Sequence, residues 1–190
     1  MENPVSVLAE VVRVLEQHQI TYVLVGSMAS SLHGIYRATA DIDFLADIKP
    51  EQVVPLLNAL QDNSFVEEPG VHEAVEQRRS FNAIHFGSVF KIDIFIPKGD
   101  DFSKTQLQRR ELRKIAPDID QEVYVATAED TILAKLRWYR AGGEVSLDQW
   151  ADVLGVLGAN RTALDVEYLH EWADKLGVRD LFDKAVAEAS

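Results

Sequence analysis

The apolar residues of this 190-residue chain change their spacing near residue 125, and this change constrains the fold more than any other feature. Before it, short runs rich in β-branched and aromatic residues predict strands at 20–25, 41–46, 65–66, 80–86 and 89–96. Helical spacing in the same part predicts helices over 5–17, over 28–32 and from Pro50. After it, helical patterns follow one another over 128–141, 147–157, 165–176 and 179–188.

This pattern predicts an α+β fold. We expect a domain over residues 1–125 with a mixed β-sheet flanked by helices, and a C-terminal helical extension over 126–190 packed on it. The sequence contains no cysteine, which excludes disulfides, thiolate zinc sites and cysteine nucleophiles. The first residues lack a basic segment, and no apolar run approaches the roughly 20 residues that span a bilayer. We therefore expect a soluble, cytoplasmic protein with no membrane partner.

The charge of the chain is unevenly distributed. Its formal net charge of −12 predicts a surface that repels nucleic acid, because such binding depends on Lys and Arg neutralising phosphates. Residues 78–140, however, hold 12 of the 19 Lys and Arg residues against 9 Asp and Glu. A basic face on an acidic body suits a small anionic ligand or a short nucleic-acid end.

Three aspartates indicate a metal site. In the predicted strand that contains Asp41 and Asp43, alternation places both carboxylates on one face. Asp93 lies in a later strand, on the face opposite its isoleucines and on the same face as Lys91. Carboxylates so close repel one another unless a cation lies between them, and Mg²⁺ prefers oxygen ligands. Three such acids on neighbouring strands could hold two metal ions, Mg²⁺ or Mn²⁺, as in phosphoryl transfer.

Each of these features also has a plainer explanation. Asp41 and Asp43 could lie on a solvated edge strand, and Asp93 could pair with Lys91 or with an arginine. Gly26-Ser27, between a predicted strand and a predicted helix, could be only a turn. The same dipeptide could also bind a triphosphate, because glycine lets the backbone approach a ligand and the helix N-terminus attracts anions.

The order of these motifs resembles a known superfamily. Val25-Gly26-Ser27, a spacer of thirteen residues and Asp41-Ile42-Asp43-Phe44 resemble the signature of DNA polymerase β-like nucleotidyltransferases, and Asp93 stands where that fold places its third acid. Other segments are similar to the AbiEii-like branch, which includes abortive-infection and toxin–antitoxin enzymes. These segments are 26–29, Gly34, 37–43, 129–136 and 148–157.

The resemblance implies roles for particular residues. Asp41 and Asp43 would be metal ligands, and Asp93 would be the third ligand and a candidate base for the acceptor hydroxyl. Gly26 and Ser27 would hold the triphosphate.

Two cations are assigned on the same grounds. Lys135 would contact phosphate or nucleotide, with a surface lysine as the alternative. Arg37 would steady a phosphate or neutralise the acids. The branch usually has a basic residue directly before an aspartate in the helix that follows the lysine, but here Asp152 follows an alanine. Asp148 is the other candidate, and the roles of both acids stay open.

The function that the resemblance implies is the metal-dependent transfer of a nucleoside monophosphate from an NTP to an acceptor hydroxyl. The acceptor could be an RNA end, a protein or a small molecule such as an aminoglycoside, and a cognate antitoxin or other partner protein is a further expectation. The alternative is a non-catalytic nucleotide-binding or regulatory module of the same fold. A purely structural protein with solvent-facing acids is a third hypothesis.

Overall fold

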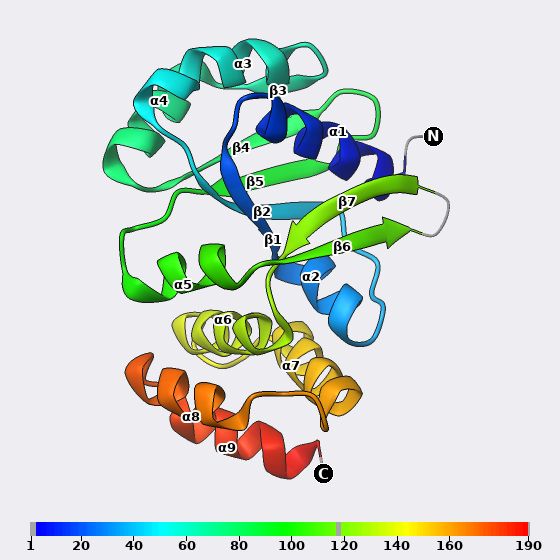
Figure 1. Cartoon of the computed structure of the whole chain (residues 1–190), viewed down its shortest axis with the longest axis vertical. Coiled ribbons are helices and arrows are strands. Elements are labelled where there is room, and N and C mark those ends of the chain that lie inside the picture. The colour runs from blue at the N-terminus through cyan, green and yellow to red at the C-terminus, as the bar shows by residue number, and fades with distance from the viewer. Residues whose placement is uncertain (1–2, 117–118, 190) are drawn as a thin grey trace. The chain divides into compact units, whose positions relative to one another are not determined.

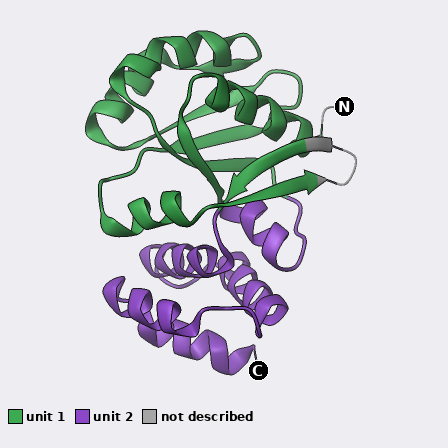
Figure 2. Cartoon of the chain, viewed as in Figure 1, with its two compact units in different colours: residues 1–25, 39–125 green, residues 26–38, 126–190 purple. Residues whose placement is uncertain are grey.

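A computed structural model describes residues 3–116 and 119–189 of the chain. The chain divides into two compact units, shown in Figure 2. Unit 1 contains Met1–Val25 and Thr39–Val125, and unit 2 contains Gly26–Ala38 and Ala126–Ser190. Residues 26–38 thus group with the C-terminal helices. The predicted boundary between a catalytic domain over 1–125 and an extension over 126–190 stays a prediction.

Unit 1 is built on a mixed sheet. Its strands are β1 (Thr21–Val25), β2 (Asp41–Asp47), β3 (Ser64–Val66), β4 (Ser80–His85), β5 (Lys91–Phe95), β6 (Glu111–Ala116) and β7 (Ile119–Val125). Their order across the sheet is β3-β4-β5-β2-β1-β7-β6. β2 runs parallel to β5 and β1 parallel to β7, whereas the other neighbours are antiparallel. The predicted α+β class with a mixed sheet, flanking helices and a C-terminal helical part is confirmed.

Helices cover the two faces of this sheet unequally. α1 (Pro4–Gln17), α3 (Val53–Gln61) and α4 (Glu68–Gln77) lie on one face, and α5 (Asp101–Arg109) lies on the other (Figure 1). Pro50 opens a 3₁₀ turn, Pro50–Gln52, that leads into α3. The fully buried Ile42, Phe44, Ile92 and Ile94 form the core of the sheet.

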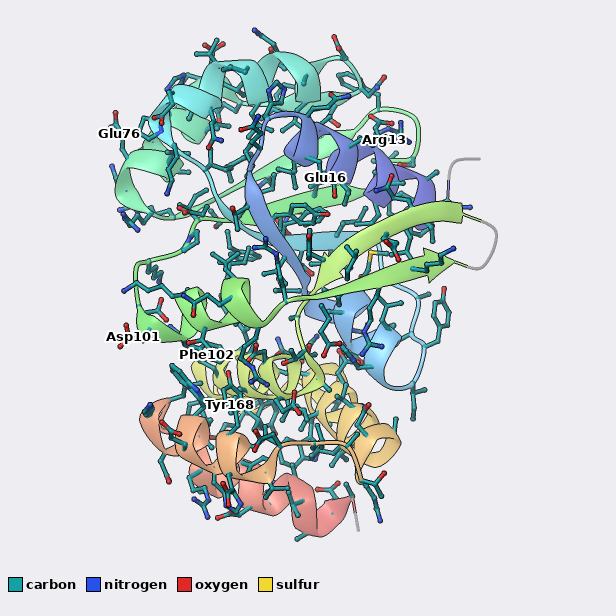
Figure 3. All side chains as sticks on the ribbon, viewed as in Figure 1. Arg13, Glu16, Glu76, Asp101, Phe102 and Tyr168 are labelled. Atoms are coloured by element: carbon teal, nitrogen blue, oxygen red, sulfur yellow. The ribbon has the colours of Figure 1, made fainter. Side chains whose placement is uncertain are left out.

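One polar contact anchors α1 to the sheet. The Tyr22 hydroxyl donates a hydrogen bond of 3.0 Å to Glu16, which is labelled in Figure 3. Burial and the neighbouring Glu16 carboxylate raise the pKa of Tyr22, so its hydroxyl keeps its proton. The Tyr22 ring also meets Phe44 edge-on at 5.8 Å between centroids.

Unit 2 is helical. It contains α2 (Gly26–His33), α6 (Ala128–Ala141), α7 (Leu147–Asn160), α8 (Val166–Lys175) and α9 (Arg179–Glu188). Thr127 caps α6 by accepting a hydrogen bond of 3.1 Å from the Asp130 N–H, which confirms the predicted start of this helix. The Tyr168 hydroxyl, from α8, donates to the Asp130 carboxylate at 2.5 Å. No helix among the described residues is long and apolar enough to cross a bilayer.

Gly34, directly after α2, lets the chain approach α7 closely. A Cβ atom on Gly34 would lie 2.8 Å from the backbone of Gly155 and of Val156. The Asn160 side chain holds the contact by donating a hydrogen bond of 2.6 Å to the His33 carbonyl. The loop that leads to Arg37 therefore starts from a position fixed by backbone-to-backbone packing.

Candidate active site

The sheet of unit 1 presents the three predicted acids on one face. In the parallel pair of β2 and β5, Asp43 lies directly opposite Asp93, and Asp41 lies opposite Lys91. Directly paired residues share a face, and alternation sends the apolar residues between them into the core. Asp41 is exposed, and Asp43 and Asp93 are half-buried. The alternation inferred from the sequence therefore holds for all three acids.

A lysine ammonium binds one of these carboxylates, and the charges of the other two act on it. The Lys91 Nζ donates to the Asp93 carboxylate at 2.8 Å. This hydrogen bond, together with the negative charges of Asp93, Asp41 and Asp43, raises the pKa of Lys91. The pairing of Asp93 with Lys91, which the sequence left open as an alternative, is thus present in the structure.

The donor set suits a magnesium ion chemically. Asp41, Asp43 and Asp93 offer carboxylate oxygens, the ligands that Mg²⁺ prefers, and they already interact jointly with one positive charge. Among residues 3–116 and 119–189, however, no group of three or more His, Cys, Asp or Glu side chains is arranged as a metal site. A metal ion would have to compete with Lys91 for Asp93.

A second polar cluster lies inside unit 2. The Lys135 Nζ donates to the Asp152 carboxylate at 2.7 Å and lies 3.3 Å from the Ser27 hydroxyl oxygen. The Arg37 guanidinium donates to Ser27 at 2.9 Å and to Asp152 at 3.4 Å. The side chains of Lys135 and Asp152 are 9% and 6% exposed, so this is a buried ion pair. The structure therefore brings together Ser27, Arg37 and Lys135, which the sequence singled out separately.

The structure also distinguishes the two acids that the sequence left open. Asp148 contacts Arg37 at 3.5 Å, but its side chain is 73% exposed. Burial disfavours the charged form of Asp152, yet hydrogen bonds from Lys135 and Arg37 outweigh burial and lower its pKa. Asp152 is therefore the ionised partner of both cations. In the sequence, Asp152 stands out only as an acid among the apolar positions of α7. That pattern does not identify the cations that it binds.

Gly26 occupies a backbone conformation that favours glycine. It begins α2 with a φ of +68°, and it follows Val25, the last residue of β1. A side chain at this φ would strain the backbone. Within unit 2, the start of α2 therefore offers a hydroxyl and a helix N-terminus near two cations, an arrangement that suits a phosphate.

The buried ion pair of Lys135 and Asp152 leads us to expect a loss of stability in Asp152→Asn. We expect this change to destabilise the protein at neutral pH by about 3 kcal/mol, because it leaves the buried Lys135 ammonium without its carboxylate. The pKa of Asp152 in the folded protein is below the usual 3.8. Its contribution is therefore complete above that value and is lost as the pH falls through the lowered pKa.

Thermal unfolding of the wild type and of Asp152→Asn between pH 7 and pH 2.5 measures this effect. The gap in melting temperature should be wide at neutral pH and should close in acid. Asp148→Asn, at the exposed acid, is the matched control and should change little at any pH. A gap that does not depend on pH would contradict the ionised state of Asp152.

Comparisons with known proteins identify a family and a shared fold. Residues 5–142 match a family described as "Nucleotidyltransferase of unknown function (DUF6036)". No curated protein matches the sequence. The structure of the antibiotic-resistance factor ANT(2'')-Ia in solution has a TM-score of 0.58 at 13% identity, covering 97% of this chain and 93% of that one.

Two further solved structures share the fold. The crystal structure of ANT(2'')-Ia with adenylyl-2''-tobramycin has a TM-score of 0.58 at 14% identity, covering 92% of this chain and 97% of that one. An antigenic nucleotidyltransferase-like protein from Paracoccidioides brasiliensis has a TM-score of 0.55 at 15% identity, covering 96% and 91%. At these identities the likeness shows the fold alone.

Proposed function

We propose that this chain, which belongs to the DUF6036 family of nucleotidyltransferases of unknown function, transfers a nucleoside monophosphate from an NTP to an acceptor hydroxyl in a metal-dependent reaction. The observation that supports this most is the direct pairing of Asp43 with Asp93 on one face of the sheet. Asp41 lies on the same face, and all three carboxylates act on the single ammonium of Lys91.

In this proposal the acids of unit 1 hold the metal and prepare the acceptor. Asp41, Asp43 and Asp93 would bind Mg²⁺ or Mn²⁺, which would neutralise phosphate charge and make the acceptor oxygen more nucleophilic. The acceptor oxygen forms a bond to the α-phosphorus, the α–β phosphoanhydride bond breaks, and pyrophosphate leaves. The hydroxyl proton passes to Asp93, for which we propose the role of base.

The cluster in unit 2 would bind the triphosphate. Arg37 and Lys135 supply positive charge, Ser27 supplies a hydroxyl, and Gly26 allows the backbone to approach the phosphates. Asp152 would act through Lys135, because its 2.7 Å hydrogen bond fixes the direction of the ammonium. Arg37 would be the more adaptable cation, since its side chain is 37% exposed.

We infer a small molecule as the acceptor rather than an RNA end or a protein. A structure with the same fold was solved with adenylyl-2''-tobramycin, and the net charge of −12 disfavours RNA. The AbiEii-like assignment, and with it a toxin–antitoxin role and a cognate antitoxin, remains a proposal from the sequence motif.

The pairing of Lys91 with Asp93 favours a second candidate function, a nucleotide-binding module that performs no transfer.

Metal-linked stability tests the proposed function. Mg²⁺–NTP that binds only the folded protein should raise the melting temperature, and at 100 times its dissociation constant it contributes roughly 2.7 kcal/mol. Asp43→Asn should abolish this increase and leave the protein without ligand at least as stable, because one repelling charge is removed. Calorimetric melting with each NTP, with and without Mg²⁺, is the measurement.

Asp47→Asn is the matched control for this experiment. Asp47 lies on the same strand, and its exposed ion pair with Lys49 contributes little to stability. The Asp47→Asn variant should therefore keep the full increase. The same increase in Asp43→Asn and in the wild type would remove Asp43 from the nucleotide site, and no increase with any NTP would overturn the proposed function.

A further inference from the structure

The face of the sheet that carries the acids continues onto an apolar surface. Across β2, β5, β4 and β3, one row of directly paired residues consists of Asp41, Lys91, Ile84 and Phe65. The neighbouring row contains Asp43, Asp93 and Asn82. Paired residues share a face. Ile84 and Phe65 therefore lie on the same side of the sheet as the three carboxylates.

The apolar part of this face is open to solvent. Phe65 is 62% exposed and Ile84 is 40% exposed, although the two side chains are direct cross-strand neighbours. Phe86, 62% exposed, follows Ile84 by two residues, and its N–H still bonds to Asn63 beside β3. α3 and α4 cover the opposite face of these strands (Figure 1). We call Phe65, Ile84 and Phe86 the apolar strip.

The packing of the folded chain does not explain why these three positions are apolar, because their side chains are exposed. A single exposed apolar side chain is ordinary, but three neighbours on an edge of a sheet expose the chain to association and usually mark a binding surface. The strip lies at the sheet edge, since β3 is the outermost strand. It is also continuous with the acids: Ile84 is the direct partner of Lys91, and Asn82 is the direct partner of Asp93.

The charge of this face limits what can lie on it. Among the described strand residues of this face on β2, β3, β4 and β5, Lys91 is the one cation, and Asp93 already binds it. A polyanion such as RNA would find no row of Lys or Arg to neutralise its phosphates. Asn82 and Ser80, on the outer face of β4, are polar but uncharged. The strip therefore suits an uncharged, apolar body.

We propose that the apolar strip binds the body of the acceptor, and that the acceptor is an uncharged small molecule with an aromatic or aliphatic face and a hydroxyl group. This inference rests on the proposed function, because it identifies the acceptor of the same reaction. Asn82 orients the molecule by hydrogen bonding, and Phe65 and Ile84 remove its apolar face from water.

The spacing of the strands sets the size of such an acceptor. Neighbouring strands lie about 4.8 Å apart, so Ile84 is roughly one strand spacing and Phe65 roughly two from the strand that carries Asp93. An acceptor whose hydroxyl lies at Asp93 must therefore carry its apolar face about 5 to 10 Å from that hydroxyl. A compact alcohol or phenol meets this condition, whereas a polycationic sugar would leave the strip uncovered.

Amide NMR shifts with 2-phenylethanol test the strip without requiring transfer activity. We expect saturable shifts in 64–66, 80–86 and Lys91, with a dissociation constant on the order of millimolar for a ligand of this size. Phenylacetate, of the same shape but anionic, should bind at least about tenfold more weakly, because the nearby carboxylates repel it. The double variant Phe65→Ser/Ile84→Ser should lose the shifts.

The controls separate binding from folding. Leu112→Ser changes an apolar residue of unit 1 that is 49% exposed on β6, and it should leave the shifts unchanged. If the double variant folds poorly, Ile84→Thr replaces it in the test. This variant keeps a β-branched side chain on the strand, so it should weaken binding with little effect on folding. All variants should keep the melting increase with Mg²⁺–NTP, since the strip is not part of the proposed nucleotide site.

Label transfer from α-labelled NTP then tests the role as acceptor site. Uncharged alcohols and phenols should accept label, and the double variant should raise their KM about tenfold while kcat stays within twofold. Label found on RNA or peptides alone would overturn the inference, and so would absent shifts with 2-phenylethanol. A dimer that becomes a monomer in Phe65→Ser, with no probe binding, would assign the strip to a second copy of the chain. If the wild-type protein binds no nucleotide, that result would instead count against the proposed function.

Discussion

Asp93→Asn is expected to reduce nucleotidyl transfer by two orders of magnitude or more while NTP affinity stays within a few fold. Asp41 and Asp43 remain on β2 to bind the metal that accompanies the triphosphate, and Lys91 loses the partner that holds it. Transfer also requires an acceptor hydroxyl that is in line and able to lose its proton. Asparagine cannot take that proton, and its neutral amide is a weaker metal ligand.

Two measurements on the same protein separate these effects. Calorimetry gives NTP affinity, and α-labelled NTP gives the rate of transfer, for the wild type, Asp93→Asn and the Asp47→Asn control. A binding module that performs no chemistry would show no such asymmetry. Equal losses of affinity and transfer would mean that Asp93 only helps to bind nucleotide, and no loss in either would place it outside the site.

Gly34→Ala is expected to destabilise unit 2 by roughly 3 kcal/mol. The added Cβ would lie 2.8 Å from the backbone of α7, which cannot rotate away as a side chain can. Either α2 moves off α7 or the bond between His33 and Asn160 is lost. Because Arg37 follows this contact by three residues, the arginine should also lose its fixed position beside Asp152.

Gly155→Ala, on the other side of the same contact, is the matched control. Its Cβ would meet Ile35 at 3.5 Å, an ordinary contact, and alanine gains up to about 1 kcal/mol of helix propensity over glycine. Urea unfolding should therefore show a large loss for Gly34→Ala and no loss for Gly155→Ala. Similar values for the two variants would mean that the α2–α7 contact is not close-packed.

The parts of this structure that follow local rules could be predicted from the sequence. The strands with Asp41 and Asp93 were predicted because alternation has a period of two residues, and the same period placed the acids away from the core. The helices of unit 2 were predicted from the spacing of their apolar residues. α4, α5, β6 and β7 were not predicted. Glu-Pro-Gly at the start of α4 suits a turn as well as a helix, and charged residues interrupt the apolar pattern of β7.

Contacts between distant residues could not be predicted. Arg37 and Asp152 are 115 residues apart, and Lys135 and Asp152 lie on different helices. Apolar spacing indicates which face of a helix is buried, but not which charges meet there. For this reason the sequence left two interpretations of Lys135 open, a phosphate-binding residue and a surface lysine. The structure shows Lys135 in a buried ion pair. The functional roles of all these residues stay predictions.

A structure with Mg²⁺ and an NTP analogue that cannot be hydrolysed between its α- and β-phosphates would test the central claim most directly. The proposed function predicts a metal ion on the sheet face that carries the acids, about 2.1 Å from carboxylate oxygens of Asp41 and Asp43. It also predicts that Lys91 moves away from Asp93, so that Asp93 joins the metal site. A nucleotide bound elsewhere, with Lys91 still paired to Asp93 and no metal on this face, would contradict it.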